Sequence, residues 1–149
     1  MSDLRNKALA YLARREYSRN ELRQKLLVRI EDEADLLKLD ALLDDFEARG
    51  WLSDGRFAEQ WVSSRASRYG PNRLRAELRQ KGVDSEQIES AIAGTEEDEL
   101  ARANAVWRRK FPNPPSDAAE RAKQLRFLAA RGFSLDVIYR IVGGEFDAD

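Results

Sequence analysis

The chain has 149 residues, of which 42% are apolar, and a net charge of -1, so it can form one domain or a few small stacked units. It contains no cysteine and no histidine, which excludes disulfides, thiolate metal sites, cysteine nucleophiles and imidazole catalysis. The GxxxxGK phosphate loop and the GxGxxG and GxSxG motifs are also absent. We therefore predict a protein that is not an enzyme and that binds no cofactor or metal.

No apolar run approaches the roughly 20 residues of a membrane span. The N-terminal stretch MSDLRNKALAYLARREYS lacks the apolar core of a signal peptide. These features predict a soluble cytoplasmic protein that does not contact the membrane.

Helix start signals are frequent along the chain, whereas strand signals are almost absent. Ser18 precedes Glu21 by three residues, Asp84 precedes Gln87, and Thr95 opens a shorter acidic variant of the same capping box. Glycines and one proline-rich loop mark the ends of the predicted helices. These signals predict nine helices, over residues 3–15, 19–29, 33–49, 54–68, 71–81, 85–93, 96–110, 117–131 and 135–142.

Similar turns suggest an internal repeat. Tyr17, Tyr69 and Phe133 each stand directly before a residue able to open a helix, and apolar positions after them coincide. A unit of about 45 residues cannot bury enough surface alone, so neighbouring units should stack. We predict an all-α protein whose three tandem three-helix repeats form an elongated, curved helical array; the repeats would be residues 1–50, 51–94 and 95–149.

Charge is segregated into blocks. Residues 31–59 carry ten acidic and three basic side chains, whereas residues 65–81 carry six basic side chains and only Glu77 as an acid. One interpretation is that neighbouring helices pair across these faces. The other is that the basic faces bind an acidic partner.

The helix predicted at 71–81 carries the clearest basic face. Glu77 lies four positions from both Arg73 and Lys81 and can pair with either one. Arg75 and Arg79 have no acid four positions away in the same helix, so an acid of a neighbouring unit or a partner must neutralise them. The candidate partner- or DNA-binding residues are Arg15, Arg23, Arg65, Arg68, Arg73, Arg75, Arg79, Lys81 and Arg131, of which Arg23 matches Arg75 and Arg131 matches Arg15 in the predicted repeat.

Four segments resemble the RecX family of regulatory proteins: LARREYSRNELRQKL (12–26), GWLSDGRFAEQWVSSR (50–65), YGPNRLRAELRQKGV (69–83) and RFLAARGFSLDVI (126–138). Together they follow the order and spacing of the family over nearly the whole chain. Two positions depart from its common pattern: Gly55 stands where an acid is usual, and Arg68 replaces a glycine before the YGP aromatic.

The resemblance implies an all-helical protein of tandem three-helix repeats that modulates the RecA recombinase. It implies binding in the groove of the RecA filament on DNA, which lowers ATPase, strand-exchange and coprotease activity. We expect a monomer. The alternative is a helical-repeat DNA-binding protein that contacts phosphates independently of a recombinase, although a net charge of -1 argues against strong binding to free DNA. Turnover of ATP or nucleic acid by the chain alone would indicate an enzyme instead.

Overall fold

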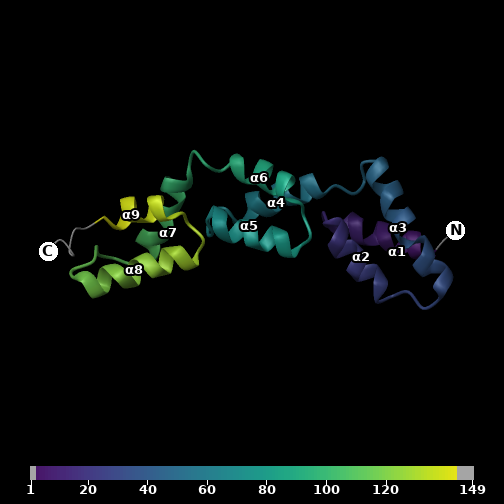
Figure 1. Cartoon of the computed structure of the whole chain (residues 1–149), viewed down its shortest axis with the longest axis horizontal. Coiled ribbons are helices and arrows are strands. Elements are labelled where there is room, and N and C mark those ends of the chain that lie inside the picture. The colour runs from purple at the N-terminus through teal and green to yellow at the C-terminus, as the bar shows by residue number, and fades with distance from the viewer. Residues whose placement is uncertain (1–2, 144–149) are drawn as a thin grey trace. The chain divides into compact units, whose positions relative to one another are not determined.

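The computed structural model describes residues 3–143; residues 1, 2 and 144–149, which hold the ends of the first and third predicted repeats, lie outside this range. The described part contains the nine predicted helices and no strand, which confirms the all-α fold (Figure 1). The helices are α1 (Asp3–Arg14), α2 (Arg19–Leu27), α3 (Glu33–Ala48), α4 (Asp54–Arg65), α5 (Pro71–Gln80), α6 (Ser85–Ala93), α7 (Glu99–Lys110), α8 (Ala118–Ala130) and α9 (Leu135–Val142).

Seven of the nine predicted helix starts are correct, and α8 begins one residue later than predicted, after its N-cap Asp117. The capping box of Ser18 and Glu21 is complete, because the Glu21 amide donates to Ser18 Oγ (3.1 Å) and the Ser18 amide donates to Glu21 Oε1 (3.3 Å). The predicted start at Thr95 is wrong. Its hydroxyl donates to the Ile92 carbonyl (2.7 Å) and so completes the end of α6, and α7 begins only at Glu99.

The helices group into two compact units, and the boundary between the units passes through α4, α5 and α6. The first unit contains residues up to Trp61 together with Leu78–Ile88. The second contains Val62–Glu77 and the chain from Glu89 onward.

The core of the first unit is built by α1, α2 and α3. Leu22 and Leu26 of α2 are fully buried, as are Leu39, Leu43 and Phe46 of α3. These residues follow the spacing of three and four that places apolar side chains on one face of a helix. Because Leu22 and Leu26 face this core, the arginines of α2 lie on its other faces.

The core of the second unit contains Leu128 of α8 and Phe133, both almost completely buried. Ile138 and Val142 of α9 and Ala103 of α7 pack into the same cluster. Hence α7, α8 and α9 form a three-helix group with one core.

The third copy of the repeated turn is in a different register from the one the sequence predicts. Tyr17 lies between α1 and α2, and Tyr69 lies between α4 and α5, but Phe133 lies between α8 and α9. The counterpart of Phe133 is therefore Val83, which stands between α5 and α6. The predicted match of Arg131 with Arg15 is wrong for the same reason, since Arg131 corresponds to Lys81.

The turn between α5 and α6 and the turn between α8 and α9 each contact the preceding three-helix group. In the first unit, Gly82 has a φ of 84° and the carbonyl of Lys81 accepts a hydrogen bond from Ser18 Oγ (2.7 Å). In the second unit, Gly132 has a φ of 93°, and its carbonyl accepts from the amide of Asn72 (2.9 Å). In both cases the turn before a third helix contacts the start of a second helix, α2 or α5.

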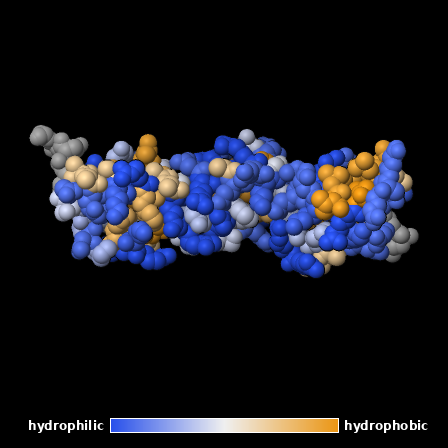
Figure 2. Space-filling model, turned by 90° about the horizontal axis from the view of Figure 1, so that it is seen from below, coloured by the Kyte–Doolittle hydropathy of each residue, from blue (hydrophilic) through white to orange (hydrophobic). Residues whose placement is uncertain are grey.

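Several large apolar side chains in the part of the chain that holds α1–α3 are exposed. Val28 and Leu37 are 82% and 77% exposed, and Leu36 is 47% exposed. Figure 2 shows apolar surface gathered over this part of the chain. Apolar surface of this kind is typical of an interface with another protein. Within residues 3–143 no helix is long and apolar enough to cross a membrane.

Candidate partner interface

Helix α5 displays its arginines because its apolar stripe is fully buried. Pro71 begins the helix, where its missing amide hydrogen costs nothing. Leu74 and Leu78 have no exposed surface. The remaining faces carry Arg73, Arg75 and Arg79.

Arg75 pairs with an acid of the next helix. Its guanidinium donates to both carboxylate oxygens of Glu89 in α6 (2.8 and 3.1 Å) and to Asn72 (3.1 Å). The hydrogen bond to Glu89 is the main reason why the pKa of Arg75 is raised. Arg75, which has no acid four positions away in α5, is thus neutralised by a neighbouring helix.

Glu77 accepts from two arginines. Arg65 of α4 binds both of its oxygens (2.8 and 2.7 Å), and Arg73 adds a contact of 3.2 Å. The predicted pairing of Glu77 with Arg73 is confirmed. The alternative pairing with Lys81 is wrong, because Lys81 reaches Glu21 instead (3.0 Å).

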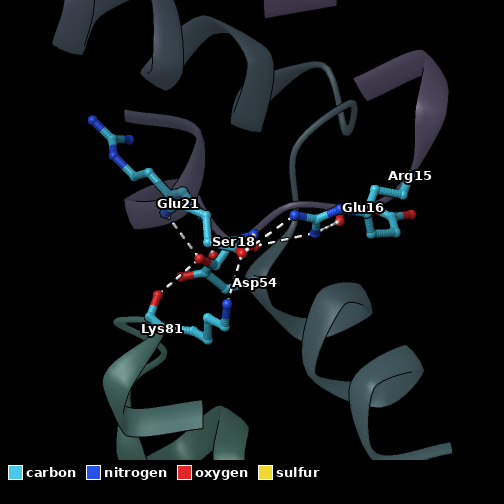
Figure 3. A network of polar contacts seen from close by, with 7 residues as sticks. Arg15, Glu16, Ser18, Glu21, Asp54 and Lys81 are labelled. Carbon is cyan, nitrogen blue, oxygen red and sulfur yellow. Dashed lines mark hydrogen bonds and ion pairs between the residues drawn. The ribbon is translucent and has the colours of Figure 1, made fainter. Parts of the chain in front are cut away.

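In the first unit, Glu21 lies at the centre of a polar network (Figure 3). It accepts from Arg15 (3.2 Å) and from Lys81 (3.0 Å). Burial alone would raise the pKa of Glu21, but the hydrogen bonds from these two cations outweigh it and hold the pKa below its ordinary value. Elsewhere in the unit, Arg23 donates to Asp40 (2.9 Å).

Six of the nine predicted interface residues thus have a carboxylate partner in their own chain. Within residues 3–143, the other three, Arg68, Arg79 and Arg131, form no salt bridge within 4.0 Å. Arg68 and Arg131 lie over the ring of Tyr69, at 5.6 and 5.3 Å from its centre. Within the described residues, these three side chains therefore carry charge that no carboxylate pairs with.

The structure adds two basic residues that the sequence analysis did not single out. Arg109 and Lys110, at the end of α7, line a surface hollow together with Arg68 and Arg131. Their only sequence signal is the basic run Arg108–Lys110 before the proline-rich loop. Cations are common at helix C-termini, where they interact favourably with the helix dipole, so this run alone does not indicate a site.

Asp54 is partly buried beside the network of Glu21 and accepts from the backbone amide of Arg19 (2.7 Å). Burial raises the pKa of Asp54 above its ordinary value, and the nearby carboxylates of Glu47 and Asp84 raise it further. The folded protein therefore holds this proton more tightly than the unfolded chain does.

Substitution of Asp54 by asparagine should stabilise the protein at neutral pH, because the amide oxygen can still accept from Arg19 while the cost of a partly buried negative charge disappears. A raised carboxyl pKa lowers stability once the pH exceeds the unfolded-state value, and the loss is complete above the folded-state value. The gain of Asp54→Asn should thus vanish as the pH falls below the ordinary aspartate range. Thermal melts at pH 7 and pH 3 measure it, and a gain that is equal at both pH values contradicts this assignment.

Sequence profiles of three domains match the chain. They are described as the first, second and third three-helix domains of RecX and match residues 5–34, 53–92 and 96–142. The chain belongs to the RecX family. The three matches lie within the segments 1–50, 51–94 and 95–149, whose exact boundaries stay a prediction.

Relatives in the RecX family cover almost the whole chain. Regulatory protein RecX of Chromobacterium violaceum is 46% identical over 146 residues, which is 98% of this chain and 93% of the relative. Regulatory protein RecX of Ralstonia nicotianae is 49% identical over 141 residues, or 95% of this chain and 87% of the relative.

Solved RecX structures share the fold. RecX from Lactobacillus salivarius superposes with a TM-score of 0.78 at 22% identity and covers 98% of this chain and 96% of its own. A second regulatory protein RecX gives a TM-score of 0.79 at 24% identity, over 96% of this chain and 74% of its own. At these identities the likeness establishes the fold alone.

Proposed function

We propose that this protein regulates a RecA-class recombinase in the cytoplasm by binding the recombinase filament on DNA and lowering its ATPase, strand-exchange and coprotease activities. The observation that carries the proposal is the match, over nearly the full length, to proteins named regulatory protein RecX. Inhibition then requires no chemistry from this chain. A higher affinity for a filament state that cannot cycle or extend is sufficient.

The exposed apolar side chains support a protein as the main partner. Val28, Leu36 and Leu37 offer surface that another protein can cover, whereas a phosphate backbone gains little from it. Arg68, Arg79 and Arg131, which form no salt bridge within residues 3–143, add charge that an acidic protein surface or DNA phosphate would neutralise.

Titration of the protein into an ATPase assay of the recombinase on single-stranded DNA tests the proposal. We expect inhibition that saturates as the filament is covered. An ATPase rate that stays unchanged when the protein is in large molar excess over the recombinase would refute it.

Within this function, Arg75 and Arg79 are the residues of α5 that we assign to the partner. The double substitution to alanine should raise the concentration needed for half-inhibition about tenfold, as expected when one or two charge-assisted contacts are lost. Helicity and melting temperature should change little, because both side chains lie at the surface.

Glu89→Gln provides the matched control, since it removes the acid that Arg75 binds while leaving Arg75 in place. If Arg75 contacts the partner, this variant should inhibit at least as well as the original protein. If the ion pair serves only the fold, Glu89→Gln and Arg75→Ala should behave alike, and α5 is then not the interface.

A further inference from the structure

A hollow of about 180 Å³ lies on the surface of the second unit. Its lining consists of Arg68, Val106, Arg109, Lys110, Phe127 and Arg131. Four of these six side chains are cations, and none is an acid. The hollow therefore concentrates positive charge in a protein whose net charge is close to zero.

Three segments bring the cations together. Arg109 and Lys110 end α7, Arg131 follows the last residue of α8, and Arg68 lies in the turn between α4 and α5. Phe127 of α8 holds two of them, because Lys110 Nζ and the Arg131 guanidinium carbon lie 5.6 and 5.1 Å from the centre of its ring. A cation–π contact orients a cation but does not cancel its charge.

The hollow differs from the other basic clusters of the chain in its lack of carboxylates. Arg65 and Arg73 share Glu77, and Arg15 and Lys81 share Glu21. Within residues 3–143, none of the four cations of the hollow forms a salt bridge within 4.0 Å. Helix dipoles favour a cation at the end of each helix separately, but they do not explain why cations from three segments converge on one hollow.

The positive charge continues beyond the hollow along a second aromatic ring. Arg68 and Arg131 also contact Tyr69, whose ring has Arg73, itself paired with Glu77, at 4.2 Å from its centre. One carboxylate cannot neutralise so many cations, whereas a polymer with a charge on every unit can. Forked guanidinium groups match phosphate oxygens, and aromatic rings amid cations are typical of surfaces that bind single strands.

We propose that this hollow binds backbone phosphates of single-stranded nucleic acid, with Arg68, Arg109, Lys110 and Arg131 as the ligating cations. The inference goes beyond the proposed regulation of a recombinase, because it gives the chain its own nucleic-acid contact. It is tested with no recombinase present, so its failure leaves the proposed function standing.

The test is fluorescence anisotropy of a labelled oligothymidine of about 15 nucleotides, titrated with the full-length protein over a series of salt concentrations. Arg109→Gln/Arg131→Gln should bind about tenfold more weakly at low salt. Its log–log salt slope should be shallower by about 1.4, since each phosphate contact on a single strand contributes about 0.7.

Arg108→Gln/Arg126→Gln is the matched control, because it removes the same charge from exposed positions of α7 and α8 that do not line the hollow. It should lose less than threefold in affinity. Thermal melts of both double variants establish that they fold. Arg68→Gln is an independent test of the hollow, because residue 68 lies outside the helices. It should weaken binding about threefold.

Two results overturn the inference. One is an equal loss of affinity in the hollow and control variants, which indicates attraction by overall charge only. The other is equally effective competition by a polyglutamate of the same length, which indicates a site for an acidic protein segment.

Discussion

Alanine at Gly132 is expected to lower the free energy of unfolding by about 3 kcal/mol, a loss near the top of the usual range for single substitutions. Gly132 has a φ of 93°, where a residue with a Cβ is strained by about 1–2 kcal/mol. A Cβ there would also lie 2.4 Å from Arg73 Cβ and 2.5 Å from the Arg73 backbone nitrogen. The backbone has little room to yield, since Gly70 and Asn72 both donate to this turn (2.8 and 2.9 Å).

Two other glycines separate strain from steric contact. Gly50 has a φ of 77° but nothing within 4 Å of an added Cβ, so its replacement by alanine should cost only about 1 kcal/mol. Gly70 has the steric contact without the strain, because a Cβ there would lie 2.5 Å from the backbone of Phe133 while its φ is not positive. Urea denaturation followed by circular dichroism compares the three variants. If Gly132→Ala is no less stable than Gly50→Ala, the turn does not fit tightly against α5.

Replacement of Arg102 by methionine should cost about 3 kcal/mol, because it leaves partly buried carbonyl groups without their donors. The side chain of Arg102 is only 10% exposed. It donates to the carbonyls of Ala66 and Thr95, at 2.6 Å each, and pairs with Asp98. It thereby ties the end of α4 and the α6–α7 turn to α7.

Arg108→Met is the control for this prediction. Arg108 is exposed on the same helix, so the substitution should change stability by less than about 0.5 kcal/mol. Arg102→Lys should fall between the two, since an ammonium group cannot span both carbonyls as the guanidinium fork does. Equal melting temperatures for Arg102→Met and Arg108→Met would show that these hydrogen bonds contribute little.

The helices could be predicted from the sequence because their signals are local. Ser18 with Glu21 identifies the start of α2 within four residues of sequence, and the cap does form. The register of the third repeat could not be predicted this way. An aromatic followed by a helix start occurs before a second helix at Tyr17 and before a third helix at Phe133, and the local pattern is the same for both.

The candidate interface could be predicted only in part, since most ion pairs depend on tertiary packing. Spacing along a helix identified the contact of Arg73 with Glu77. It could not identify Glu89 as the partner of Arg75, because that acid lies on another helix. Nor could it bring Arg68, Arg109 and Arg131 to one hollow, since three segments distant in sequence form it.

We propose that the main partner is a recombinase filament and not nucleic acid alone. The most direct test compares the affinity of the labelled protein for naked single-stranded DNA and for the same DNA coated with recombinase, at matched salt. We expect binding at least tenfold tighter to the coated strand, because protein surface adds apolar contacts to those with phosphate. Equal or weaker binding to the coated strand would contradict it.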